Sequence, residues 1–249
     1  MKISVCFKIV PDYDQVPAKD WKGGLSLPDF RFIKKNLGIF DEGALELAAC
    51  FKDSLKDTYL EAVSVGKPEP IFTETIYAAG YDNVVYINNI GSEFDPSNTA
   101  RALAEYFKNS DTDMILCGEQ VGPADSGTVP YFLGGLLNFP IINSVSDIFI
   151  EDNKVYIERD TAEVTEIYDY PGKMIAVVSG SKHPYLRFAS YEEKLKAEKR
   201  KCERKTIITF PQLTHVVFSK QKNVKKNTVF LDDAMELHKL ISEVHDERV

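Results

Sequence analysis

The residues best suited to chemistry lie in one stretch, from Cys117 to Val129, with the sequence CGEQVGPADSGTV. A short apolar run, residues 114–116, precedes it and is typical of a buried parallel strand. The apolar segment 131–137 follows it and is typical of a helix. Backbone N–H groups at a helix start are unpaired, and the helix dipole there favours a phosphate. The stretch therefore indicates an anion site, although an ordinary strand-to-helix turn has the same local pattern.

Three residues inside this stretch predict how the helix begins. Asp125 and Ser126 are residue types that cap helices, because their side-chain oxygens accept hydrogen bonds from the first backbone N–H groups. Gly127 has no side chain and lets a ligand approach the backbone closely. The sequence thus predicts a capped helix start that is open to an anion.

The bulk composition is that of a soluble globular protein. The 249 residues are 44% hydrophobic and 27% charged, and the net charge of −8 argues against a general nucleic-acid surface. No apolar run reaches the roughly 18 residues that a membrane span needs, so we expect no membrane insertion. The first residues enter a strand without the apolar core of a signal peptide, which predicts a cytoplasmic or matrix-like location.

The cysteines and histidines offer no metal site or His-based catalytic group. The four cysteines are scattered, and no two have metal-ligand or CxxC spacing. All four histidines lie in the last third of the chain, away from the predicted anion site. Disulfides, zinc and histidine catalysis are therefore not expected.

Apolar runs alternate with amphipathic stretches through the first 180 residues. Strands are predicted at 3–10, 59–65, 83–87, 114–117 and 174–178, with a hairpin over 148–157. Helices are predicted at 41–52, 73–79 and 131–137, and from Asp95 through Phe107. This alternation predicts an α/β fold with a doubly wound, mostly parallel sheet of the Rossmann-like, adenine-nucleotide α-hydrolase-like type.

The last quarter of the chain differs in composition. Basic residues dominate from Lys194 to Lys205, and a final helix is predicted from about Asp232. Most charged runs are solvated surface, but one of this length outside the core also suits an arm that grips a partner.

Five short motifs, in this order, resemble those of the β subunit of electron transfer flavoproteins. They are Phe7-Lys8-Ile9-Val10-Pro11-Asp12, Gly38-Ile39-Phe40-Asp41-Glu42-Gly43-Ala44-Leu45-Glu46, Val63-Ser64-Val65-Gly66, Gly118-Glu119-Gln120 with Phe139-Pro140, and Arg187-Phe188-Ala189-Ser190. The family's counterparts, in the same order, are V-K-x-V-P-D, then N-P-F-D-E-x-A-L-E, then the strand and turn that precede its second helix, then G-[KR]-Q with W-P, and last R-Y-A-T. The similarity extends from residue 1 to about residue 205.

The resemblance implies an adenine-nucleotide-binding domain over residues 1–180. It implies a recognition loop and subunit-binding arm over 181–249, wrapped around an α subunit that carries the redox-active FAD. This chain would then be an electron-carrier subunit rather than an enzyme. The implied nucleotide contacts are Phe7, Lys8, Ile9, Gly38, Asp41, Ser64, Val65, Gly66, Gln120, Asp125, Ser126, Gly127, Thr128 and Val129. We expect the N–H groups of Gly127, Thr128 and Val129 to hold the phosphates.

The nucleotide itself is left open between AMP and FAD. AMP-binding members have N-Q-T-G where this chain has Gly127-Thr128-Val129-Pro130. Electron-bifurcating members, which hold a second FAD, have D-T-A-Q-V-G, and the segment from Asp125 to Pro130 resembles it slightly better.

The resemblance also implies a docking surface for a partner dehydrogenase. After R-Y-A-T the family places an anchoring leucine, and Tyr191 occupies that position here. A bulkier, amphipathic anchor implies a different redox partner. The implied docking residues are Arg187, Ala189, Ser190, Tyr191 and Leu195.

An alternative from another class is a free-standing adenine-nucleotide sensor or hydrolase on the same fold. The chain has no Walker sequence, no G-x-G-x-x-G and no clustered metal carboxylates. A nicotinamide dehydrogenase is disfavoured further, because the first strand runs into Pro11-Asp12 and not into a glycine fingerprint.

Overall fold

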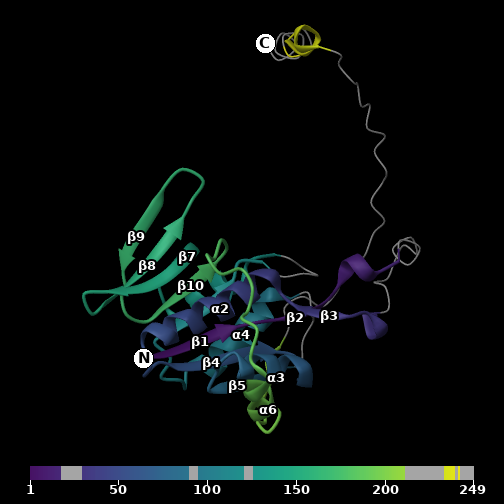
Figure 1. The fold of residues 1–249 in the computed structure, drawn as a ribbon, viewed down its shortest axis with the longest axis vertical. Coiled ribbons are helices and arrows are strands. Elements are labelled where there is room, and N and C mark those ends of the chain that lie inside the picture. The colour runs from purple at the N-terminus through teal and green to yellow at the C-terminus, as the bar shows by residue number, and fades with distance from the viewer. Residues whose placement is uncertain (18–29, 90–94, 121–125, 211–232, 239–240, 242–249) are drawn as a thin grey trace.

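A nine-stranded sheet forms the centre of the protein (Figure 1). The computed structural model describes residues 1–17, 30–89, 95–120, 126–210, 233–238 and 241. The strands are β1 Lys2–Cys6, β4 Tyr59–Val65, β5 Asn83–Asn89, β6 Met114–Gly118, β7 Ile141–Glu151, β8 Lys154–Asp160, β9 Thr165–Asp169, β10 Met174–Val178 and β11 Glu203–Ile207. Their order is β11-β5-β4-β1-β6-β10-β7-β8-β9, and only the pairs β7–β8 and β8–β9 are antiparallel. The predicted α/β fold with a mostly parallel sheet is confirmed.

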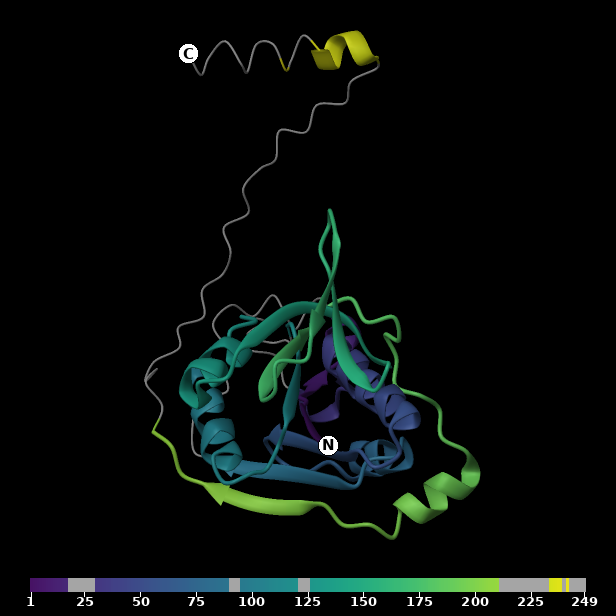
Figure 2. The same ribbon diagram turned by 90° about the vertical axis from the view of Figure 1, so that its left-hand side faces the viewer.

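Helices cover both faces of the parallel part of the sheet (Figure 2). One face carries α2 Ile39–Ser54, α3 Pro70–Ala78 and α6 Tyr191–Ala197, and the other carries α4 Pro96–Phe107 and α5 Val129–Leu137. The strand residues alternate between the two layers. In β6, Met114 and Leu116 pack with α2, whereas Ile115 and Cys117 pack with α4 and α5. β6 and β10 are buried on both faces, which explains why the sequences of these two strands are apolar.

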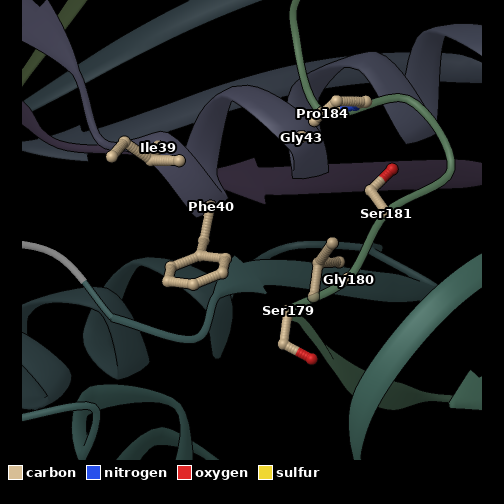
Figure 3. A pocket seen from close by; sticks show the side chains of 8 residues that line it. Ile39, Phe40, Gly43, Ser179, Gly180, Ser181 and Pro184 are labelled. Carbon is tan, nitrogen blue, oxygen red and sulfur yellow. The ribbon is translucent and has the colours of Figure 1, made fainter.

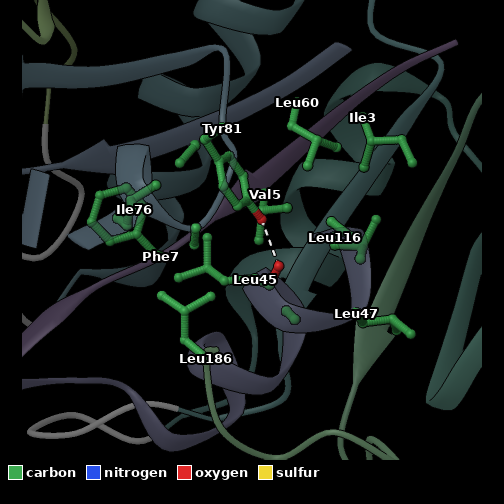
Figure 4. Close-up of a cluster of buried hydrophobic side chains, with 14 of the residues drawn as sticks. Ile3, Val5, Phe7, Leu45, Leu47, Leu60, Ile76, Tyr81, Leu116 and Leu186 are labelled. Atoms are coloured by element: carbon green, nitrogen blue, oxygen red, sulfur yellow. Dashed lines mark hydrogen bonds between the residues drawn. The ribbon is translucent and has the colours of Figure 1, made fainter. Parts of the chain in front are cut away.

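The core beneath α2 contains a buried phenol with a defined partner (Figure 4). Tyr81 is fully buried, and its hydroxyl donates a 2.8 Å hydrogen bond to the carbonyl of Leu45 in α2. That bond satisfies the one polar atom that the ring brings into the apolar layer. It also ties α2 to the turn between α3 and β5.

The helix predicted from Asp95 begins with the expected capping chemistry, whereas the helix predicted at 73–79 begins three residues earlier, at Pro70. Asp95 caps α4 and accepts hydrogen bonds of 3.1 Å from the N–H groups of Ser97 and Asn98. Pro96 and Pro70 occupy the first turns of α4 and α3, where a missing N–H costs nothing. Within the described residues, no helix has both the length and the apolar composition that crossing a membrane requires.

The first strand is shorter than predicted. β1 ends at Cys6, because the backbone N–H of Lys8 donates to the Asp41 carboxylate and not to a neighbouring strand. Ile9–Pro11 then forms β2, which pairs antiparallel with β3 Lys35–Leu37 outside the main sheet. The apolar alternation from Ile3 to Val10 is continuous in sequence, but its residues belong to two separate sheets.

The basic run from Lys194 to Lys205 begins in α6 and ends in β11, which is a strand of the main sheet. β11 pairs in parallel with β5 and forms one edge, and β9, also absent from our expectations, forms the other. Both are charged edge strands, so their sequences lack the apolar pattern of a buried strand. Residues 234–238 are helical, as predicted. Whether residues 181–249 act as a separate unit stays a prediction.

The first turn of α2 lies unusually close to the end of β6. A Cβ built on Gly118 would lie 2.7 Å from the backbone N of Asp41 and 2.8 Å from the carbonyl carbon of Phe40. No side chain fits there, so glycine at position 118 sets how closely α2 approaches the sheet.

We therefore expect Gly118→Ala to lower the free energy of unfolding by about 2–3 kcal/mol, since the added methyl group overlaps backbone atoms that cannot rotate away. Gly135→Ala is the matched control, because a Cβ at that helical position meets nothing within 4 Å. Urea denaturation of both variants measures the difference. Equal stability of the two variants would contradict the steric constraint.

Candidate functional site

Most of the predicted nucleotide-site residues that the structure describes lie at the carboxyl ends of β4, β1 and β6. The sheet order reverses here: α2 and α3 lead from β1 to β4 and β5, whereas α4 leads back to β6 on the other side of β1. Such a switch point is where α/β sheets bind ligands. Phe7, Lys8 and Ile9 follow β1; Gly38 and Asp41 lie at the start of α2; Ser64, Val65 and Gly66 end β4; and Gln120, Ser126, Gly127, Thr128 and Val129 follow β6.

Asp41 joins the separate segments of this edge. Its carboxylate accepts the backbone N–H of Lys8 at 2.9 Å and also the backbone N–H of Gly118. The residue is 4% exposed. Burial raises the pKa of the carboxyl to about 7, although both backbone N–H groups and the Lys8 charge act in the opposite direction. The structure thus gives Asp41 backbone partners; a nucleotide contact for it stays a prediction.

Two further predicted residues point their side chains into the protein. Phe7 is buried and meets Tyr86 edge to face, with 5.8 Å between ring centroids. Ser64 is buried as well. A ligand at the edge would therefore meet the backbone of these two residues rather than their side chains.

The described residues on the two sides of the turn after β6 lie against each other. Gly127 has φ +61°, and a Cβ there would lie 3.0 Å from the carbonyl of Glu119 and 3.4 Å from Cγ of Gln120. Glycine relieves both the left-handed backbone and the crowding. The exposed Gln120 and the half-buried Gly127 therefore lie side by side; their sharing of a nucleotide site stays a prediction.

The predicted capping of this helix is wrong for Ser126. The N-cap of α5 is Thr128, and its side chain makes no capping hydrogen bond. Ser126 Oγ lies 3.0 Å from Thr128 Oγ1, so the two hydroxyls pair with each other. Asp125 lies outside the described residues. Pro130 lacks an N–H, so the first free donors of the helix start are those of Val129 and Tyr131.

A pocket of about 160 Å³ opens beside this edge, between α2 and the end of β10 (Figure 3). Ile39, Phe40 and Gly43 line it from α2, and residues 178–181 with Pro184 line it from the other side. Our sequence analysis missed it. Its sequence signal is Ser179-Gly180-Ser181, small residues that directly follow a buried strand at the same edge of the sheet.

The predicted docking residues have different environments. Arg187 is held against α2 by its guanidinium, which contacts Glu46 at 2.8 Å and Asp53 at 2.6 Å. Ala189 packs against the core. Tyr191 is 77% exposed and Leu195 is exposed on the same helix, α6.

The start of α6 is a capping box. Ser190 Oγ accepts the N–H of Glu193 at 3.3 Å, and the Glu193 carboxylate accepts the N–H of Ser190 at 2.6 Å. The S-x-x-E sequence could have revealed it. Phe188, fully exposed one residue after Arg187, is the apolar side chain that our docking prediction omitted.

One comparison with known proteins bears on this arrangement. The family model described as "electron transfer flavoprotein domain" matches residues 34–211. The match covers more than half of the chain and includes α2, the turn after β6 and the segment around Arg187. Among the described residues, no group of three or more His, Cys, Asp or Glu side chains is placed to hold a metal ion.

The raised pKa of Asp41 predicts a pH dependence of stability. The folded pKa, about 7, lies above the ordinary value of 3.8, so the folded state holds an extra proton between them. This contribution to the free energy of unfolding is full below the ordinary pKa and is lost as pH rises through about 7. Between about pH 5 and pH 8, wild type should lose on the order of 3 kcal/mol relative to Asp41→Asn.

Denaturant titrations at several pH values measure this difference. Asp111→Asn is the control, because the Lys2 side chain lowers the pKa of the exposed Asp111 and no titration is expected in that window. Parallel pH profiles for wild type and Asp41→Asn would show that Asp41 is ionised throughout.

Proposed function

The chain belongs to the electron transfer flavoprotein domain family, and on this premise we propose that it is a β-type subunit, which pairs with an α subunit carrying FAD. Members of this family form α/β heterodimers and carry electrons between other proteins. The observation that carries the β assignment is a contact between two motifs. The segment resembling R-Y-A-T is bonded through Arg187 to Glu46, the last residue of the segment resembling N-P-F-D-E-x-A-L-E.

We propose that the strand-end edge holds a nucleotide, AMP or FAD. Gly127 supports this, because it has no side chain at a turn whose left-handed backbone and close contact with Glu119 and Gln120 disfavour a Cβ, so a ligand can approach its backbone closely. The start of α5 supports it too: the Thr128 side chain makes no capping hydrogen bond there, and the N–H groups of Val129 and Tyr131 suit phosphate oxygens. A bound AMP would be structural, whereas a bound FAD would add a second redox centre.

We further propose that Phe188, Tyr191 and Leu195 form the surface that meets the partner dehydrogenase; we call them the docking group. All three are apolar or amphipathic and exposed, and they lie within one short segment. Exposed aromatic side chains of this kind contribute most of the binding energy in many interfaces. In this arrangement the chain positions flavins and partners, and the electron moves between flavins.

The nucleotide content of the purified heterodimer tests the proposal. Co-expression with an α-type flavoprotein should yield a stable complex, and denaturation should release its nucleotides for chromatography. One FAD and one AMP per heterodimer would make this chain's nucleotide structural. Two FAD without AMP would place a flavin at residues 127–129. A chain that pairs with no α-type flavoprotein and releases no nucleotide would contradict the proposal.

The docking group makes a separate prediction. Tyr191→Ala should raise the KM for the reducing dehydrogenase by about tenfold, because an exposed aromatic anchor is lost. Pairing with the α subunit and nucleotide content should not change. Tyr168→Ala, at a part-exposed tyrosine on the edge strand β9, is the control. If both variants transfer electrons with unchanged KM, the partner binds elsewhere.

A further inference from the structure

One face of α2 carries side chains that all bind the same segment. Glu42, Glu46, Cys50 and Asp53 are spaced by four, four and three residues, so they line up along the helix, and we call them the α2 stripe. Glu42 accepts the backbone N–H of Leu186 at 3.3 Å. The three others contact Arg187.

Arg187 uses nearly every donor it has. Its backbone N–H donates to Glu46 at 2.7 Å and its Nε donates to the same carboxylate at 2.9 Å. Nη1 donates to Asp53 at 2.6 Å, and Nη2 lies 3.4 Å from the Cys50 sulfur. Such a fork fixes both the position and the orientation of the residue.

Glu46 is the buried member of the α2 stripe. It is 6% exposed, whereas Asp53 is largely solvated. A buried carboxylate is costly unless it is paired and hydrogen-bonded, and Arg187 does both for Glu46. Separating Glu46 from Arg187 would therefore cost more free energy than separating an ion pair on the surface.

This contact determines which side chains of the segment face outward. Leu186 and Ala189 pack against the core on either side of Arg187 and Phe188. With Arg187 held on α2, Phe188 is left fully exposed. Gly43 lets the chain cross α2 closely, since a Cβ there would lie 3.3 Å from Cβ of Ser181.

The helix that carries the docking group is anchored again at its far end. Ala197, the last residue of α6, is buried, and Arg200 donates to the carbonyl of Tyr81 at 2.7 Å. Between these anchors, Tyr191 and Leu195 are exposed. Arg187 stands three residues before Ser190, the N-cap of α6, so the anchored residue and the helix start are joined by a short stretch of chain.

We propose that the α2 stripe, and Glu46 above all, positions the docking group by holding Arg187. Glu46 is then a positioning residue: it is buried under the segment, and the segment presents Phe188 and Tyr191. The role of the docking group as a surface for a partner rests on the proposed function. The positioning of residues 185–191 by Glu46 is independent of that function.

Hydrogen exchange of the full-length chain, followed by mass spectrometry, tests this. Glu46→Ala should speed amide exchange in peptides covering residues 185–191 by about tenfold or more, because the segment opens locally once its anchor is removed. Peptides from β1 and β4 should exchange as in wild type. Glu61→Ala is the matched control: Glu61 is an equally buried glutamate in β4, bonded to Ser4 and not to this segment.

Asp53→Ala serves as the milder variant, because Asp53 is solvated and its loss leaves the fold intact. It should speed exchange in the same peptides by a smaller factor. Exchange at 185–191 that stays at the wild-type rate in both variants would overturn the proposal. So would an increase spread equally over all peptides, which would mean that Glu46 only stabilises the fold.

The same experiment separates the two proposals. Local opening in Glu46→Ala, in a chain that pairs with no α subunit, would support the positioning role and overturn the proposed function. A normal heterodimer whose Glu46→Ala variant keeps the wild-type exchange at 185–191 would overturn the positioning role alone.

Discussion

The contact between the first turn of α2 and the end of β6 is the constraint on which the other features depend. Gly118 contributes no side chain, so the backbone of Asp41 can lie against it, and the Asp41 carboxylate then reaches the N–H groups of Lys8 and Gly118. This fixes where α2 begins relative to β1 and β6. Because a helix is rigid over four turns, it also fixes where the far end of the α2 stripe lies.

The buried strands could be predicted from sequence because burial on both faces leaves a continuous apolar run. Tyr59–Val65 and Met174–Val178 have the predicted bounds for this reason. β9 and β11 could not be predicted in this way. Their sequences, TEIYD and ERKTI, are charged because an edge strand has one neighbour and a solvated face. Their pairing depends on the neighbouring strand and not on their own composition.

The sequence was enough to predict which positions form the candidate site. It was not enough to predict how buried their side chains are or what they bind. Strand ends and a glycine-containing turn are visible in sequence, so the edge itself could be named. Asp41 and Lys8 are 33 residues apart, and no local pattern shows that the carboxylate of one is buried on the backbone of the other. Arg187 was predicted as a docking residue for the same kind of reason: the motif marks the segment but not the direction of each side chain.

A buried ion pair such as Glu46–Arg187 is a weak source of stability, since apolar residues of similar volume often do as well. What apolar residues would not provide is direction. Phe188 and Tyr191 gain nothing from being exposed in the free chain, and collapse onto the protein surface would bury apolar area. A fork of directional bonds on the preceding residue opposes that collapse. The arrangement keeps an apolar surface exposed until something covers it, which is what the proposed docking role requires.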